Sequence, residues 1–268
     1  MPELPEVETV RRRLLHGLHG EGAVRGARIV IVDVVDPAVV RSGALQRLVG
    51  RRVVDVTRRA KWITLHTDAA VKLVVHLKMT GDLHVVDAAD ANSARFVRLR
   101  LFLDDGRCLV FTDPRRFGHV DVTDDANSLF ADLGPEPLDA AFTAAALAAR
   151  LRGRRAIKAT LIDQRVVAGL GNIYADEALH RAGIDPRRST LSLTTIEIHA
   201  LHRAIQEVLY GGIAAAEKEL AWRYESRTAA SPFSVYERAG LPCLRCGTTL
   251  ASTSVAGRLT VWCPHCQR

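Results

Sequence analysis

The residue types at the start of the chain are suited to nucleophilic chemistry. The sequence opens Met1-Pro2-Glu3-Leu4-Pro5-Glu6-Val7-Glu8. If Met1 is removed, as expected when a small residue follows it, Pro2 becomes a secondary amine with carboxylates beside it. An α-amino group titrates at about 7.7–8.0, against about 10.4 for lysine, so a fraction is unprotonated at neutral pH and able to attack an electrophile. A second interpretation stays open here, because Pro and Glu are also typical of a helix N-terminus.

Four of the five cysteines form two pairs near the C-terminus, Cys243-x-x-Cys246 and Cys263-x-x-Cys266, with sixteen residues between the pairs. Each short turn can aim two thiolates at one tetrahedral ion, and the intervening length suits a β-hairpin. The pattern predicts one structural Zn²⁺, because four thiolates leave no open position for a reacting water. Within the expected hairpin, Arg258 follows Gly257 and is either a turn residue in water or a functional one. Cys108 stands apart and is expected to be a small core residue.

Two glycines precede a helical pattern in the segment 169–177, which reads Gly-Leu-Gly-Asn-Ile-Tyr-Ala-Asp-Glu. Such a turn lets the backbone approach a ligand, and the first N–H groups of a helix can bind a phosphate. Asn172 is therefore a candidate phosphate contact. A plain connection between helices with an Asn cap would have the same residues.

Two further segments, 76–81 and 112–118, place apolar and basic side chains in expected loops. Met79 and Phe117 are candidates for wedges between DNA bases, and Arg115 for filling the space that a base leaves. The alternatives are ordinary ones, since a Met in a turn is more often part of a core and His76 is more often structural than a phosphate ligand.

The charge of the chain favours a polyanionic partner. Its 268 residues contain 37 Lys and Arg against 30 Asp and Glu, which gives a net charge of +7. Arginines cluster at 11–13, 51–52, 58–59, 115–116 and 152–155, and their planar guanidinium groups suit bidentate phosphate contacts. No apolar run has the length of a signal peptide or a membrane span. We therefore expect a cytoplasmic protein that binds nucleic acid and no membrane.

The first half of the chain has one helical pattern followed by strand patterns. Apolar residues at Val7, Val10, Leu14 and Leu18 predict an amphipathic helix from about residue 5 to 18. Short runs rich in Val, Ile, Leu and Thr predict eight strands, at 28–35, 52–58, 62–67, 71–77, 82–86, 96–103, 108–112 and 119–122. Strands at this spacing indicate a β-sandwich with the helix packed on it.

The pattern becomes helical beyond residue 132, so the fold class is α+β. Helices are expected at 142–151, 156–164, 173–182 and 194–210. Residues 211–234 begin with two glycines and are expected to be only partly helical. We expect three domains: a β-sandwich domain at 1–131, a helical domain at 132–234, and a cysteine module at 235–268.

The order of these motifs resembles that of the bacterial formamidopyrimidine-DNA glycosylases. The resemblance rests on the first eight residues, on segments 58–61, 76–81, 113–118, 133–138 and 169–175, and on the four-cysteine module. It covers essentially the whole chain. It implies a catalytic β-sandwich domain, a helix-two-turn-helix domain and a zinc finger that act on double-stranded DNA, in a protein expected to be a monomer.

The resemblance also implies a role for each candidate residue. Pro2 would attack C1′ of the damaged nucleotide and form a Schiff base, and Glu3 would protonate the sugar ring oxygen. Lys61 would assist β-elimination and Arg258 δ-elimination. The remaining candidates would contact DNA, with His76, Asn172 and Arg154 at phosphates and Met79, Arg115 and Phe117 in the gap that the extruded nucleotide leaves.

This chain departs from the family pattern at two places. A DNA-binding histidine is absent from the region that reads Ala94-Arg95-Phe96-Val97-Arg98, so Arg95 or Arg98 is expected to supply that contact. After Gly211-Gly212 the family has a threonine-rich and basic lesion-capping loop, whereas this chain continues Ile-Ala-Ala-Ala-Glu-Lys-Glu-Leu at 213–220. The choice of damaged base therefore stays open.

Three functions are compatible with this pattern. The leading prediction is a bifunctional DNA glycosylase and abasic-site lyase that excises oxidised purines such as 8-oxoguanine and formamidopyrimidines. An endonuclease VIII-like enzyme for oxidised pyrimidines shares the architecture. A non-catalytic zinc-finger protein that binds damaged DNA is the third, and the joint presence of Pro2, Glu3, Lys61, Asn172 and Arg258 argues against it.

Overall fold

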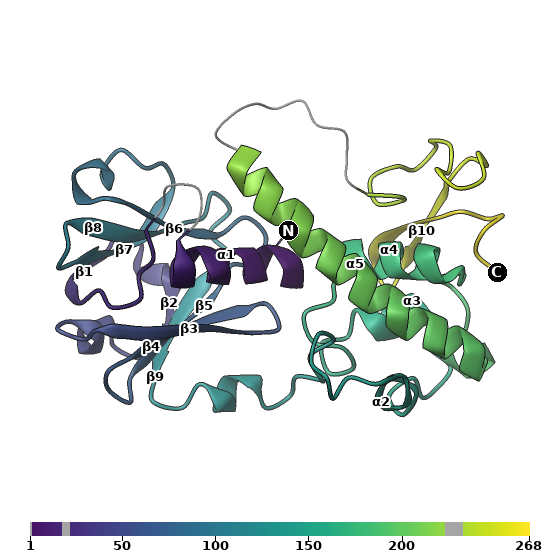
Figure 1. Cartoon of the computed structure of the whole chain (residues 1–268), viewed down its shortest axis with the longest axis horizontal. Coiled ribbons are helices and arrows are strands. Elements are labelled where there is room, and N and C mark those ends of the chain that lie inside the picture. The colour runs from purple at the N-terminus through teal and green to yellow at the C-terminus, as the bar shows by residue number, and fades with distance from the viewer. Residues whose placement is uncertain (1, 18–21, 223–232) are drawn as a thin grey trace. The chain divides into compact units, whose positions relative to one another are not determined.

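The computed structural model describes residues 2–17, 22–222 and 233–268, and the chain divides into two compact units, Met1–Ala131 and Asp132–Arg268 (Figure 1). The first unit is a β-sandwich with an N-terminal helix. The second unit combines helices with a short β-hairpin near the C-terminus, so the cysteine module belongs to the same compact unit as the helices. None of the helices in the described ranges has both the length and the apolar character needed to cross a membrane.

Helix α1 (Leu4–His16) opens the first unit. Glu3 is its N-cap and forms a capping box with Glu6, and the helix ends where Gly17 adopts a positive φ of 72°. Val7, Val10 and Leu14 are buried, as their helical spacing predicts. The helix packs against β3 and β4 of one sheet and β6 of the other.

The strands of the first unit form two sheets, one of four strands in the order β1-β7-β8-β6 and one of five in the order β2-β9-β5-β4-β3. Their bounds are Ile29–Val34 (β1), Val40–Ser42 (β2), Val53–Arg59 (β3), Trp62–Thr67 (β4), Lys72–His76 (β5), Asp82–Asp87 (β6), Val97–Leu103 (β7), Arg107–Thr112 (β8) and His119–Thr123 (β9). The predicted sandwich is confirmed, and strand β2 was missed. This strand has three residues and pairs in parallel with β9, so it is too short to have a readable periodicity.

Among the described residues, short 3-10 helices lie between these strands at Pro37–Val39 (η1), Leu45–Leu48 (η2) and Ala88–Asp90 (η3), and Asn127–Phe130 (η4) follows β9. The core of the unit lies between the sheets and includes apolar residues of α1 and of strands from both sheets. Because one face of α1 is part of this core, its N-terminus has a rigid support.

The second unit contains α2 (Ala144–Ala148), α3 (Ile157–Leu161), α4 (Asn172–Ala182), η5 (Thr190–Ser192) and α5 (Thr195–Trp222). Helices α4 and α5 pack together. Each predicted helix is present, although α2 and α3 are shorter than expected.

Helix α5 extends beyond its predicted end at Tyr210 and continues through Gly211 and Gly212 to Trp222, so the described part of the segment predicted to be partly helical is helical. A Cβ on Gly212 would lie 2.4 Å from the ring of Tyr174, so this glycine allows α4 and α5 to approach closely rather than ending the helix. The alanines at 214–216 also favour helix. The sequence 213–220 is therefore helical and is no capping loop, and the rest of the expected loop, 223–232, lies outside the described residues.

The cysteine module contains the hairpin of β10 (Ala251–Val255) and β11 (Arg258–Trp262). Val255 pairs with Arg258 across a turn in which both Ala256 and Gly257 have positive φ, 50° and 71°. Such a tight turn places Arg258 at the tip of the hairpin. The buried cluster of the module is small and includes two of the cysteines, Cys243 and Cys263.

Candidate functional site

Pro2 and Glu3 lie at the N-terminus of α1. Pro2 is half-buried, whereas Glu3 is fully buried, and its backbone N–H donates to Glu6 Oε2 at 2.8 Å. The capping box fixes the direction in which the chain enters the helix. The capping box thus holds Glu3 in one conformation, directly after Pro2 in the chain.

Two sets of ion pairs fasten α1 to the sheets. Glu8 accepts hydrogen bonds from Arg11 and Arg12 of the helix and from Arg58 at the end of β3, at 2.7 to 3.2 Å. Burial alone would raise the pKa of Glu8, but these hydrogen bonds and charges outweigh burial and lower it to about 2. On the other side, buried Arg13 donates to Asp82 of β6 at 2.7 Å. The helix therefore cannot rotate about its axis without breaking buried contacts.

Lys61 lies in the two-residue turn between β3 and β4, where Arg59 pairs with Trp62 and Ala60 has a φ of 52°. Its charge acts on His76 at the end of β5. Burial, together with the charges of Lys78, His119, Lys61 and Arg41, lowers the pKa of His76 to about 3.

His76 is therefore neutral at physiological pH. Its Nδ1 accepts the backbone N–H of Lys78 at 3.0 Å, which leaves the ring proton on Nε2. The imidazole stacks with His119 at 5.6 Å and meets the ring of Trp62 edge-on at 4.6 Å. His76 is thus held by its neighbours and presents one N–H donor, a group suited to a phosphate oxygen.

The carboxylate of Asp113 organises the loop that follows β8. It accepts the backbone N–H groups of Arg115, Phe117 and Gly118 at 3.1, 2.8 and 2.7 Å, and the Thr80 hydroxyl from the segment before β6. Burial would raise the pKa of Asp113, but these donors lower it. Sequence reasoning missed this residue, although its place at the head of the loop was a usable signal.

The result is a loop that holds two candidate side chains outward. Phe117 is 52% exposed, and the Arg115 guanidinium lies 5.0 Å from the centre of its ring. Met79 is half-buried in the neighbouring loop. The structure thus places Met79, Arg115 and Phe117 in two adjacent loops that share the Asp113 carboxylate.

In the second unit, the structure brings Asn172 and Arg258 close together. Asn172 is the first residue of α4, and its Nδ2 donates to Leu259 O at 3.1 Å. Arg258 is the preceding residue of the hairpin and is exposed. Arg154 is exposed in the segment before α3, next to Arg155, whose guanidinium pairs with Asp163 at 3.2 Å.

A buried ion pair supports the strand that carries Arg258. Lys158 of α3 and Asp176 of α4 are both fully buried at the side chain and lie 2.7 Å apart. Lys158 Nζ also donates to Leu259 O and Thr260 Oγ1 at 2.9 and 2.8 Å, and Asp176 Oδ2 accepts from Val261 N–H at 3.1 Å. Burial raises the pKa of Asp176 to about 6 despite the neighbouring Lys158.

Sequence reasoning also missed this pair, because a lysine and an aspartate on two helices show no sequence signal for burial. Its contacts lie on successive residues of β11. The pair therefore fixes the hairpin strand against α3 and α4.

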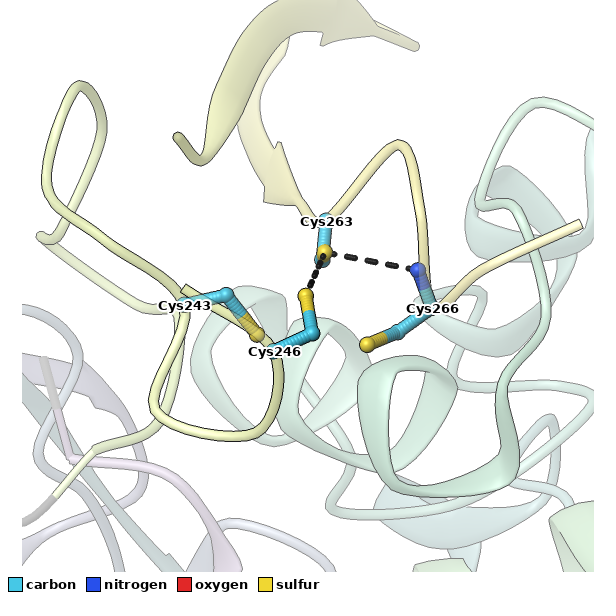
Figure 2. Close-up of side chains that lie close together, drawn as sticks. All are labelled: Cys243, Cys246, Cys263 and Cys266. Atoms are coloured by element: carbon cyan, nitrogen blue, oxygen red, sulfur yellow. Dashed lines mark hydrogen bonds between the residues drawn. The ribbon is translucent and has the colours of Figure 1, made fainter. Parts of the chain in front are cut away.

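The four cysteines of the module converge on one point (Figure 2). Their sulfur atoms all lie within 4.8 Å of one another, and those of Cys246 and Cys263 are 3.4 Å apart. A tetrahedral zinc with Zn–S bonds of about 2.3 Å needs sulfurs about 3.8 Å apart, so the cluster fits that ion. Burial and neighbouring thiols raise the pKa of Cys266 to about 12 and so disfavour its thiolate. A bound dication would stabilise the thiolate by coordinating it.

Helix α4 also docks the metal-binding module. Glu177 accepts the backbone N–H groups of Ser234, Val235 and Tyr236 at 2.8 to 2.9 Å. At the other end of the helix, His180 Nε2 lies 3.5 Å from Cys243 Sγ, and Arg245 donates to His180 O at 2.9 Å. The helix that begins at Asn172 therefore also positions the cysteine module.

The candidate residues are divided between the two units. Pro2, Glu3, Lys61 and the loop residues belong to the first unit. The phosphate candidates Asn172 and Arg154, the hairpin residue Arg258 and the four cysteines belong to the second.

Family models match three successive parts of the chain. Residues 1–120 match the formamidopyrimidine-DNA glycosylase N-terminal domain, residues 133–222 match the H2TH domain of the same glycosylase, and residues 240–268 match a zinc finger found in FPG and IleRS. The helix-two-turn-helix and zinc-finger predictions are confirmed by these matches.

The chain is also similar to individual proteins over its whole length. A formamidopyrimidine-DNA glycosylase of Chloroflexus aggregans is 46% identical over 274 residues, which cover 100% of this chain and 98% of the relative. A Lactococcus lactis formamidopyrimidine-DNA glycosylase, solved non-covalently bound to DNA containing an AP site, superposes with a TM-score of 0.87 at 32% identity, with 100% of both chains covered. The MutM (Fpg) protein of Thermus thermophilus has a TM-score of 0.82 at 38% identity, with 99% of this chain and 98% of that chain covered.

Proposed function

The chain belongs to the formamidopyrimidine-DNA glycosylase family and is a DNA glycosylase of base excision repair, and from this premise we propose how its residues act. The substrate is double-stranded DNA that contains oxidised purines, including 8-oxoguanine and formamidopyrimidines. The same active site cleaves the strand at the resulting abasic site. The observation that carries this proposal is the position of Pro2 directly before the buried N-cap residue Glu3, at the start of a helix packed into the core.

Removal of Met1 exposes the secondary amine of Pro2. This amine attacks C1′ of the damaged nucleotide, the bond from C1′ to the base breaks, and the base leaves. Glu3 donates a proton to the ring oxygen of the sugar as the ring opens, which yields the Schiff base. The burial of Glu3 at the start of α1 supports this role, because it holds the carboxyl group in one position directly after Pro2 in the chain.

Strand cleavage then follows in two eliminations. Lys61 assists β-elimination, in which a proton leaves C2′ and the 3′ phosphate departs. Arg258 assists δ-elimination of the 5′ phosphate. Support for Arg258 comes from its place beside Asn172 and from the buried Lys158–Asp176 pair that holds its strand.

The remaining candidates bind the DNA. Asn172, Arg154 and the N–H of His76 contact phosphates. Met79, Arg115 and Phe117 occupy the gap left by the extruded nucleotide, which offsets the unstacking free energy of a few kcal/mol. The one bound Zn²⁺ is structural and would be held by Cys243, Cys246, Cys263 and Cys266. We further propose that the protein acts as a monomer in the cytoplasm.

A borohydride trapping experiment tests the chemistry. The protein is made with a cleavable N-terminal tag and incubated with an abasic-site duplex and borohydride before and after tag removal. We expect a covalent adduct at the N-terminal peptide only after removal, with similar DNA binding in both forms. An adduct or normal strand cutting by the tagged protein would refute the Pro2 mechanism, and binding without any adduct would leave only a DNA-binding role.

A panel of duplexes tests the substrate class. It contains 8-oxoguanine, a formamidopyrimidine or thymine glycol at one position of the same sequence. Faster excision of the two purine lesions is expected, and preferential excision of thymine glycol would instead identify the endonuclease VIII-like activity.

A further inference from the structure

A pocket in the second unit has no part in the proposed function. It lies where the C-terminal end of α4 meets α5 and the cysteine module, and its volume is about 550 Å³. Ligand pockets in proteins have volumes of about 300–1,000 Å³. The pocket therefore has room for a small ligand or for a few side chains of a partner.

The pocket is lined by arginines from three separate segments. These are Arg181 of α4, Arg203 of α5 and Arg245 of the cysteine module. Against them stands one acidic side chain among the described lining residues, that of Glu207, one turn after Arg203 on α5. Positive charge therefore predominates in this basic pocket, which favours an anionic ligand.

The three arginines differ in their partners. Arg181 Nε pairs with the carboxylate of Glu207, and Arg245 donates to His180 O at 2.9 Å. Arg203 is exposed, and no hydrogen bond or ion pair joins it to another of the described residues. Its planar guanidinium is thus available for a bidentate contact with a ligand oxyanion.

Small apolar side chains form another part of the lining. Ala200 and Ala204 lie one helical turn apart on α5, and Ala182 is the last residue of α4. Ala204 is buried, whereas Ala200 and Ala182 are half-buried. A ligand with an apolar side chain next to its negative charge would remove apolar surface from water here.

The basic pocket lies at the opposite end of α4 from the proposed phosphate contact. Asn172 is the first residue of this helix, and residues 180–182 at its end line the pocket. A helix of 11 residues is about 16 Å long. A phosphate at its N-terminus lies on the helix axis, beyond the first turn. DNA held at Asn172 would therefore leave the pocket open.

The lining also distinguishes between kinds of anion. No Phe, Tyr or Trp is among the described residues that line the pocket, so a nucleotide base would have no such ring on which to stack. A carboxylate needs only a guanidinium group, and Arg181 already holds the carboxylate of Glu207. Carboxylates next to apolar side chains would match both the arginines and the alanines.

We propose that the basic pocket binds an acidic peptide segment of a partner protein. One carboxylate of the segment pairs with Arg203, and an apolar side chain beside it covers Ala200 and Ala204. Because the pocket and Asn172 lie at opposite ends of α4, the partner binds while the protein holds DNA. The site is thus an addition to the proposed glycosylase function and uses none of its residues.

Fluorescence anisotropy with defined peptides tests the proposal. The probes are fluorescein-labelled hexapeptides, each with one leucine or phenylalanine at a different position among aspartates. They are titrated with the full zinc-loaded chain after its DNA-binding surface is saturated with a duplex that contains a reduced abasic site, which cannot form a Schiff base. At least one probe should bind, and the same peptides with lysine in place of aspartate should not.

Two matched substitutions on α5 locate the binding site. Arg203→Glu should weaken binding of the best probe roughly tenfold or more, because repulsion replaces a charge-assisted contact. Lys218→Glu makes the same charge change at another exposed position of the helix and should leave binding unchanged. Both variants should retain the unfolding midpoint and strand cutting of the wild type.

A charge exchange separates direct contact from an indirect structural effect. A probe with one lysine in place of an aspartate should recover affinity for Arg203→Glu and not for Lys218→Glu. Recovery requires that the substituted residue and the peptide meet.

Three outcomes would overturn the inference. The first is that none of the aspartate probes binds the DNA complex. The second is an equal loss of affinity in both variants, which would mean that the probes respond to net charge alone. The third is binding to the free protein that the duplex abolishes, which would assign the pocket to the DNA-binding surface. The borohydride adduct is independent of all three.

Discussion

The N-terminal helix and the cysteine module both carry residues with proposed chemical roles, but different forces hold them. Helix α1 contributes Val7, Val10 and Leu14 to the large core of the sandwich, and its ion pairs add orientation. The module has only a small apolar cluster. Its position depends instead on the four sulfurs, on the Glu177 carboxylate and on the buried Lys158–Asp176 pair.

This difference indicates where the protein is most sensitive to substitution. A large core tolerates the loss of one polar contact, because burial of apolar surface continues to hold the helix. A small module buries too little apolar surface to be stable on that basis, so it needs a metal or buried polar contacts. Loss of a buried polar contact should therefore lower the free energy of unfolding more in the second unit than in the first.

Loss of the metal should have the largest effect. Cys263→Ser removes one of four ligands, so we expect loss of bound zinc, unfolding of the module and a decrease in DNA affinity of about 100-fold or more. Metal analysis and a DNA-binding titration measure both results. Cys108→Ala, which removes a buried thiol outside the cluster, should retain zinc and affinity. Full DNA affinity in metal-free protein would contradict the assignment of these cysteines.

Breaking the buried ion pair should have the next largest effect. Lys158→Met leaves the Asp176 carboxylate buried without its partner, which should lower the free energy of unfolding by about 3–5 kcal/mol. The double change Lys158→Met and Asp176→Leu should recover part of that loss, since two apolar side chains need no partner.

Denaturant unfolding of the two variants measures this effect. Lys72→Met serves as the control, because Lys72 Nζ makes only exposed contacts with backbone carbonyls. Equal stability of Lys158→Met and wild type would show that the pair does not support the hairpin.

The smallest effect is expected at the N-terminal helix. The pKa of Glu8 is about 2 in the folded state against 4.5 for the free group. The ionised group therefore stabilises the fold fully above about pH 4.5, and that contribution is lost as the pH falls toward 2. Glu8→Gln should lower the free energy of unfolding by about 2–3 kcal/mol at pH 7.

Urea unfolding at pH 7 and pH 3 checks the pH dependence. The difference between Glu8→Gln and wild type should shrink at pH 3, while exposed Asp87→Asn should match wild type at both values. A difference that stays constant with pH would mean that Glu8 acts through its shape rather than its charge.

Much of the fold could be predicted from local pattern. Helical spacing of Val7, Val10 and Leu14 and runs of β-branched residues are properties of short segments, and α1 and the eight predicted strands are present. The zinc site could also be predicted from local sequence, because two cysteines separated by two residues can both bind one ion. The predicted end of α5 at Tyr210 was wrong, because Gly212 accommodates the ring of Tyr174 on another helix and does not end the helix.

The sequence by itself determined the chemical types of the site: an N-terminal amine next to a carboxyl group, a thiolate set for zinc, and basic and apolar loop residues for DNA. Only the tertiary structure decided how these groups are supported. Asp113 joins its own loop to Thr80 and to Phe96, and Lys158 and Asp176 hold the strand of Arg258. Each depends on residues far apart in the chain, whose contacts and burial no local pattern encodes.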